Sequence, residues 1–193
     1  MSTLLVQQFQ GSPPETHLGA AYWAISTNTF DTKGVYTLAA QGYVSAAHED
    51  LEFPTIAATD GPETLMSFTL NGNGGPSGAD NGGFYPSSAY GILTTQSGGL
   101  LSSTIHISAL GRSPYDGSTE YLSLVPYPPR WGDYGWAIYV PSTPGSSNGN
   151  IYFASEYIQH PNCNDAKFLK DPTCGGTRGL LANWGSSVSS FAT

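Results

Sequence analysis

Residues 130–158 read RWGDYGWAIYVPSTPGSSNGNIYFASEYI, and this stretch determines the fold that we expect for the whole chain. Residues 135–140, GWAIYV, are a short and almost wholly apolar run, which is typical of a strand buried on both faces. Residues 141–150 are mostly Pro, Ser, Thr, Gly and Asn, which favour a turn. A second β-favouring run follows in residues 151–157. The stretch therefore predicts two strands joined by a loop.

The composition of the whole chain also favours β-structure. Of the 193 residues only 10% are charged, whereas 12% are aromatic and there are 24 Gly and 14 Pro. Long Ala-, Glu-, Lys- and Leu-rich stretches are absent, and β-branched and aromatic runs are interrupted every few residues by Gly, Pro, Ser or Asn. We therefore expect an all-β chain of antiparallel strands. Further strands are expected at residues 4–9, 20–25, 35–44, 64–70, 87–95, 103–110 and 180–191, with turns at 11–17 and 97–99.

The charge of the chain argues against two classes of partner. Its net charge is -8, and its six Lys and Arg residues form no run. Nucleic acids and anionic membranes need clustered basic side chains, so neither is expected to bind. No apolar segment approaches the roughly 20 residues of a membrane span.

The two cysteines, Cys163 and Cys174, are expected to form a disulfide. A zinc pair is the alternative, but two more ligands at suitable spacing are missing. Few charges, an isolated cysteine pair and polar loops together predict a secreted protein, extracellular or periplasmic. The N-terminal sequence MSTLLVQQFQ does not resemble a signal peptide. We expect either that a signal was removed and a start Met added, or that the chain begins partway through a longer product.

A weak internal repeat supports this β-rich organisation. Residues 53–57, 85–89 and 134–137 share an aromatic residue, then a turn-prone or small residue, then a short run ending in Ala. Short strands at near-regular intervals, with a unit of about 40–60 residues, favour a β-propeller or a β-sandwich. We expect a single domain of about three four-stranded, blade-like units: 1–50, 51–111 and 130–193.

The phrases RWGDYGWAIYV, NIYFASEYI and ANWGSSV resemble the C-terminal blades of secreted bacterial sialidase-like, BNR-type β-propeller proteins, whose functions are mostly unassigned. The upstream phrases GYVSAAHEDLEFPTIAATD, TLMSFTLNGNGG and YPSSAYG are similar to the preceding blade, so the resemblance extends over residues 20–188. The sialidase Asp-box, Ser-x-Asp-x-Gly-x-x-Trp, is not met in residues 113–120.

Three units are also fewer than the four blades of most closed propellers. The resemblance therefore implies a partial or oligomer-completed ring. Such a ring would expose unpaired strand edges at its ends. We accordingly predict a homo-oligomer or a part of a larger chain.

Three acidic residues are the candidate catalytic groups. By the repeat, Glu52 and Asp133 fall just before the innermost strand of their units, where propeller side chains reach the central channel, and Glu156 ends the next strand. Asp133 and Glu156 could act as the acid and the nucleophile or base of glycoside hydrolysis, with retention at a separation of about 5 Å and inversion at roughly 6.5–9.5 Å. Alternatively, Asp133 pairs with Arg130 or caps a turn, and Glu156 accepts backbone hydrogen bonds.

Aromatic side chains near these acids are candidates for binding a sugar ring, since exposed aromatic faces beside carboxylates suit such ligands. Trp131 is the preferred ligand-facing residue, whereas core packing better explains Trp136. The candidate substrate-binding residues are Arg130, Trp131, Tyr134, Tyr157 and Trp184.

Metal and cofactor sites are poorly supported. Asn71, Asn73 and Asp80 lie in a Gly- and Asn-rich stretch, residues 71–83, that could hold calcium or could be a solvated loop. The histidines show no metal-ligand spacing, and no phosphate-binding or dinucleotide-binding motif is present. We expect no cofactor, with calcium as the one possible ion.

The sequence therefore predicts a secreted carbohydrate-active protein, similar to a glycoside hydrolase, that acts on a glycan or polysaccharide. The alternative is a non-catalytic β-propeller module that binds a glycan or a protein. Nothing in the sequence decides between them, because one fold hosts many functions.

Overall fold

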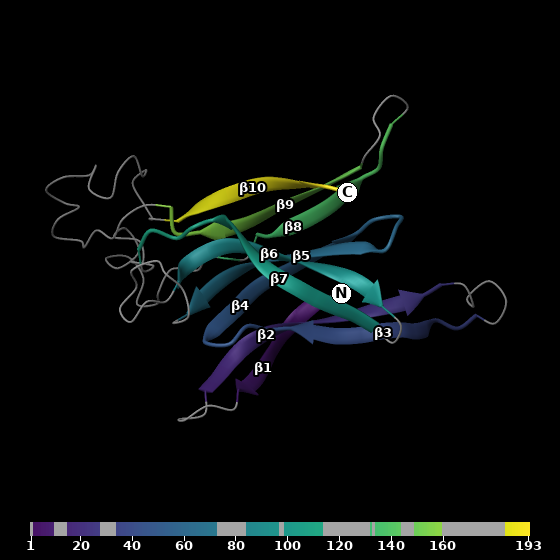
Figure 1. The fold of residues 1–193 in the computed structure, drawn as a ribbon, viewed down its shortest axis with the longest axis horizontal. Helices are drawn as coiled ribbons and strands as arrows, with labels where there is room; N and C mark the ends of the chain where they lie inside the picture. The colour runs from purple at the N-terminus through teal and green to yellow at the C-terminus, as the bar shows by residue number, and fades with distance from the viewer. Residues whose placement is uncertain are drawn as a thin grey trace, which may run out of the picture.

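The computed structural model describes residues 2–9, 15–27, 34–72, 84–96, 99–113, 132, 134–143, 149–159 and 184–193. Within these ranges the chain forms strands and no helix (Figure 1). It follows that the described ranges contain no helix long and apolar enough to cross a membrane. The strands are β1 (Ser2–Phe9), β2 (Glu15–Ser26), β3 (Thr37–Val44), β4 (Glu49–Ala58), β5 (Glu63–Gly72), β6 (Phe84–Gln96), β7 (Gly99–Ala109), β8 (Trp136–Val140), β9 (Asn150–Tyr157) and β10 (Gly185–Ala192).

The strands form three antiparallel sheets, each built from strands that follow one another in the chain. Sheet A has the order β1-β2-β3, sheet B the order β4-β5-β6-β7, and sheet C the order β8-β9-β10. Every pairing is antiparallel, and no sheet closes into a barrel. The prediction of an all-β antiparallel chain is confirmed. Sheets A and C have three strands each in the described residues, where units of four had been expected.

Sheet B lies between the other two sheets (Figure 1). On one side β4 packs against β1 and β2, and β7 packs against β3. On the other side β4 packs against β8, β5 and β6 pack against β9, and β7 touches β10. The first strands of the three sheets are therefore neighbours, and so are the last strands. The result is a stack of three similarly ordered meanders.

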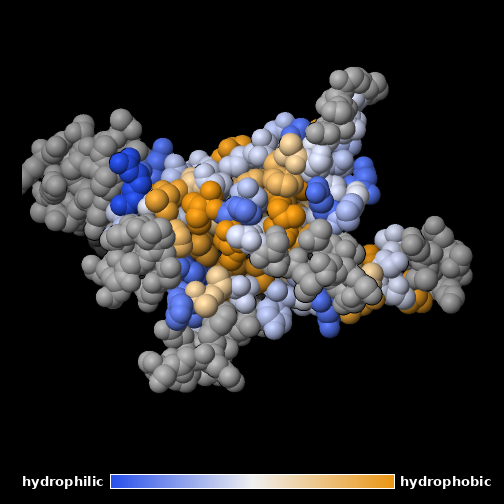
Figure 2. All heavy atoms as spheres, viewed as in Figure 1, coloured by the Kyte–Doolittle hydropathy of each residue, from blue (hydrophilic) through white to orange (hydrophobic). Residues whose placement is uncertain are grey.

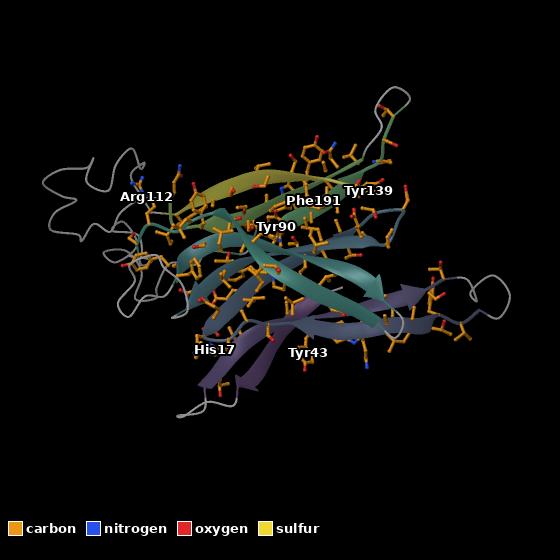
Figure 3. The ribbon with its side chains drawn as sticks, viewed as in Figure 1. His17, Tyr43, Tyr90, Arg112, Tyr139 and Phe191 are labelled. Atoms are coloured by element: carbon orange, nitrogen blue, oxygen red, sulfur yellow. The ribbon has the colours of Figure 1, made fainter. Side chains whose placement is uncertain are left out.

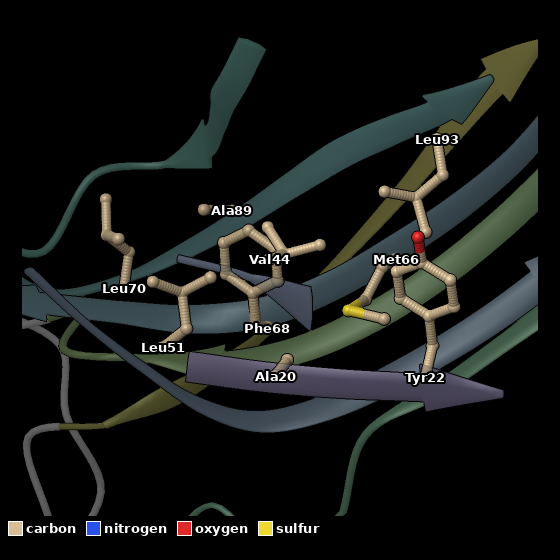
Figure 4. Close-up of a cluster of buried hydrophobic side chains, with 9 residues drawn as sticks. All are labelled: Ala20, Tyr22, Val44, Leu51, Met66, Phe68, Leu70, Ala89 and Leu93. Atoms are coloured by element: carbon tan, nitrogen blue, oxygen red, sulfur yellow. The ribbon is translucent and has the colours of Figure 1, made fainter. Parts of the chain in front are cut away.

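Strand β5 shows why sheet B takes the middle position. Its residues 64–70 are all buried, and apolar side chains occur on both of its faces, as expected for a strand covered on both sides. Met66, Phe68 and Leu70 point toward sheet A, where they join a buried cluster (Figure 4). Leu65 points the other way and packs with residues of sheet C. The cluster between sheets A and B consists of Ala20, Tyr22, Val44, Leu51, Met66, Phe68, Leu70, Ala89 and Leu93.

A second apolar cluster lies between sheets B and C. Leu65 packs there with Ile151 and Phe153 of β9. The ring of Tyr90 on β6 lies 5.0 Å from that of Phe153 and 6.3 Å from that of Phe191 (Figure 3). Such ring separations are typical of packed aromatic pairs. The two clusters together explain how a central sheet is stabilised from both faces.

Several strand ends differ from the sequence predictions. The turn expected at residues 11–17 overlaps β2, which begins at Glu15 because its first residues pair with the end of β1. Gly99, the last residue of the turn expected at 97–99, belongs to β7. Strand β5 extends to Gly72, because its last residues pair with the start of β4. Long-range pairing therefore extends strands into segments with turn-like composition.

The prediction that residues 135–140 are buried on both faces is wrong. In β8, Trp136, Ile138 and Val140 are 46%, 52% and 44% exposed, while Ala137 and Tyr139 pack inward. Core packing is therefore also the wrong explanation of Trp136. The physical reason is that sheet C lies at the end of the stack, so only one of its faces meets sheet B.

Candidate functional site

Glu52 lies on β4, the edge strand of sheet B, opposite Thr69 of β5. Its side chain is half-buried, and this burial raises the pKa of the Glu52 carboxyl above its ordinary value. The negative charge of Asp50 raises the same pKa further. Both causes disfavour the carboxylate and favour the protonated acid. The Glu52 carboxyl therefore holds its proton to higher pH than an exposed glutamate does.

The backbone around this acidic segment is irregular. The register of β4 against β5 shifts between Glu52 and Thr55, and Phe53 in this bulge has φ 53°. His48, just before β4, has φ 66°. A non-glycine residue with positive φ is uncommon, and both bulges and such residues are enriched near functional sites. The irregular backbone therefore marks this end of β4 as a candidate site.

Glu156 lies near the end of β9 and is only 3% exposed. Its carboxylate accepts a hydrogen bond from the backbone N–H of Gly132. Its backbone carbonyl oxygen accepts a hydrogen bond of 2.9 Å from the hydroxyl of Thr69. Thr69 is also the partner of Glu52 in sheet B. Thr69 therefore connects β4, which carries Glu52, with β9, which carries Glu156.

The residues just before β8 lie against the bulge in β4. Gly132 has φ 87°, and a Cβ atom at this position would collide with the ring of Phe53. A Cβ atom on Gly135 would lie 2.9 Å from the side chain of Thr55. Tyr134, between these two glycines, is 81% exposed. Glycine is therefore required at both positions for this segment to approach the candidate site closely.

The structure thus brings together Glu52, Glu156 and the segment that carries Tyr134. The alternative expectation for Glu156, that it accepts backbone hydrogen bonds, is met by the bond from Gly132. Tyr157 is half-buried and pairs with Gly185. Trp184 immediately precedes Gly185 and therefore lies at the same end of sheet C. Seven other candidates, Arg130, Trp131, Asp133, Asn73, Asp80, Cys163 and Cys174, lie outside the described residues.

Contacts of the Asp50 carboxylate connect sheet A to the same end of sheet B. The Asp50 carboxylate accepts a hydrogen bond of 2.6 Å from the backbone N–H of Leu18 on β2. Nδ1 of His17 lies 3.3 Å from the same carboxylate oxygen (His17 is labelled in Figure 3). Asn71 pairs with Asp50 in the sheet, so this calcium candidate belongs to a strand. The described residues contain no group of three or more His, Cys, Asp or Glu side chains suited to a metal.

Buried hydroxyl groups between sheets B and C were not found from the sequence. The hydroxyl of Ser88 lies 2.7 Å from that of Ser108 and 2.9 Å from that of Ser155. The hydroxyls of Thr55 and Ser67 lie 2.7 Å apart. These contacts satisfy polar groups that would otherwise be costly to bury. The only sequence signal was the presence of Ser and Thr at inward positions of otherwise apolar strands.

No protein-family model, no curated protein and no solved structure matches this chain. The function must therefore be argued from the chain's own residues.

Proposed function

We propose that this protein is an extracellular carbohydrate-active protein that hydrolyses a glycosidic bond, with Glu52 as the general acid. The observation that carries the proposal is the raised pKa of the Glu52 carboxyl, caused first by burial and then by Asp50. A carboxylic acid with a raised pKa keeps its proton to higher pH than an exposed one, and such an acid can protonate the leaving oxygen of a glycoside.

The surroundings of Glu52 support the same proposal. Glu156 binds the backbone of Gly132, so it positions the segment whose next residues are Asp133 and Tyr134. Asp133 is then the second carboxylate, acting as nucleophile or base, and the exposed ring of Tyr134 packs against a sugar. Glu156 serves as a positioning residue because its carboxylate is already engaged with the backbone.

The stacked meanders support a propeller-like form of the fold. Consecutive propeller blades are antiparallel meanders that pack face to face with their first strands innermost. Sheets A, B and C stack in chain order with β1, β4 and β8 on one side. Glu52 and Gly132 both belong to this side, which would line the central channel of a ring.

The test is a screen of chromogenic glycosides with the wild-type protein and the Glu52→Gln variant. We expect the variant to lose activity by about 100- to 10,000-fold, because general acid catalysis contributes a factor of this size. Glu63→Gln is the matched control, since Glu63 begins β5 at the opposite end of its pairing with β4. Full turnover by Glu52→Gln with intact folding contradicts the assignment of Glu52.

A second candidate function is non-catalytic glycan binding. It is favoured by the engagement of the Glu156 carboxylate with Gly132, which is a structural contact. In that case a glycan array would detect binding by the wild-type protein and by Glu52→Gln, but not by Tyr134→Ala. No glycoside in the screen would be turned over by any of the three proteins.

A further inference from the structure

The outer surface of sheet A is a face of large apolar side chains, which we call face A. It contains Trp23 and Ile25 of β2 and Leu38 and Tyr43 of β3. Ile25 and Leu38 are partners in the sheet. In the same ladder, Trp23 pairs with Gln41 and Tyr43 pairs with Ala21. Each of the four is between 37% and 56% exposed.

The outer surface of sheet C is a second apolar face, called face C. Trp136, Ile138 and Val140 of β8 alternate with residues that pack inward. Tyr152 of β9 pairs with Ile138, and Val188 of β10 pairs with the same Ala154 as Trp136 does. Face C therefore extends across all three strands of the sheet, and these side chains are between 39% and 68% exposed.

These two faces do not have the pattern of a solvated sheet. A strand with one face in water normally alternates apolar and polar residues, whereas apolar residues on both faces are typical of a covered strand. The strand β8, WAIYV, is apolar on both faces although one of them is open. The exposed sheet partners Gln41 of Trp23 and Ser190 of Tyr152 are polar but uncharged. Apolar residues gather over the middle of the stack as well (Figure 2).

Sheet B shows how such faces are covered within this chain. One of its faces is covered by sheet A and the other by sheet C, in each case with the first strands together. Face A and face C are the two ends of that stack, on opposite outer sheets. Placing sheet A of a second copy on sheet C of the first would repeat the same sheet-on-sheet packing.

We propose that face A of one copy binds face C of a second copy of this chain, so that the stack continues from one molecule into the next. The contact is heterologous, with different surfaces on the two partners. Copies joined in this way form a closed ring when the rotation between them permits and an open chain when it does not. Because the buried residues are uncharged, the association should depend little on salt.

The test uses two variants that each block one face. Leu38→Glu introduces a charge into face A, and Ile138→Glu introduces a charge into face C. We expect the wild-type protein to self-associate at micromolar concentration and each variant alone to be monomeric in analytical ultracentrifugation. An equimolar mixture of the two variants should form a 1:1 heterodimer, since one intact face A then meets one intact face C.

The heterodimer is the outcome that separates this proposal from its alternatives. A strictly monomeric wild-type protein contradicts it, and so does association that only one of the two variants abolishes, which would indicate a face pairing with itself. Ser142→Glu, at an exposed position after β8, is the control and should associate as the wild type does. Far-UV circular dichroism checks folding. If Leu38→Glu or Ile138→Glu unfolds, Ile25→Lys and Val188→Lys replace them at the two exposed faces.

Discussion

Two acidic residues near one end of sheets B and C have different environments. Glu156 is buried, and its carboxylate accepts a hydrogen bond from the Gly132 backbone. Glu52 is half-buried beside Asp50, so its pKa is raised. The proposed function draws on this contrast, with Glu156 as a positioning residue and Glu52 as the general acid.

The raised pKa of Glu52 predicts a pH dependence of stability. The folded protein holds this proton to higher pH than the unfolded chain does, so the contribution of Glu52 to stability is complete below its unfolded pKa. As pH rises above the ordinary value of 4.5 and through the higher folded pKa, that contribution is lost. Glu52→Gln removes the titration.

Urea unfolding between pH 4 and pH 8 measures this effect. We expect the free energy of unfolding of Glu52→Gln, relative to the wild type, to increase with pH across this interval. Glu63→Gln serves as the control for removal of one negative charge. Equal pH slopes in the wild type and Glu52→Gln would show that the carboxyl of Glu52 has no shifted pKa.

At the scale of single elements, the hairpin of β2 and β3 depends on a glycine. Gly42 lies opposite Tyr22 in the ladder, and a Cβ atom at position 42 would collide with the Tyr22 hydroxyl oxygen. Tyr22 is almost wholly buried between sheets A and B, so its ring has little room to move. Glycine at this position lets an aromatic ring lie across the neighbouring strand.

Gly42→Ala should therefore destabilise the protein by about 1–3 kcal/mol, the usual cost of overpacking a core. Chemical denaturation measures the change in the free energy of unfolding. Gly61→Ala is the matched control, because the nearest atom to a Cβ atom there is 3.6 Å away. If both variants have the same stability, the packing of Tyr22 on Gly42 is unimportant.

At the scale of the whole molecule, sheet B couples the unfolding of the two outer sheets, because it packs against both. Phe68 fills the cluster shared with sheet A, and Phe153 fills the cluster shared with sheet C. Because one central sheet contributes to both clusters, we expect the three sheets to unfold together.

Phe68→Ala and Phe153→Ala should each lower the free energy of unfolding by about 3–5 kcal/mol and keep a single transition. Far-UV circular dichroism and tryptophan fluorescence, followed in the same urea titration, should give coincident curves. Two separated transitions in Phe153→Ala, one for sheet C and one for the remainder, would contradict this cooperativity.

The sequence by itself determined the all-β class and most strand positions. Local patterns include the strand-forming runs at residues 64–70 and 135–140 and the turn-forming segment at 141–150. The hairpin predicted around residues 141–150 is confirmed by the pairing of Trp136 with Ala154. Residue alternation and turn chemistry depend on neighbouring residues, so they can be read without the tertiary structure.

Only the tertiary structure decided which faces of these strands are covered. The apolar run in β5 is buried on both sides, whereas the similar run in β8 has an open face, and no local pattern distinguishes them. The hydrogen bond from Thr69 to Glu156 joins residues 87 positions apart in the chain. Such contacts are set by how whole sheets stack, because the free energy of burying a face depends on the distant element that covers it.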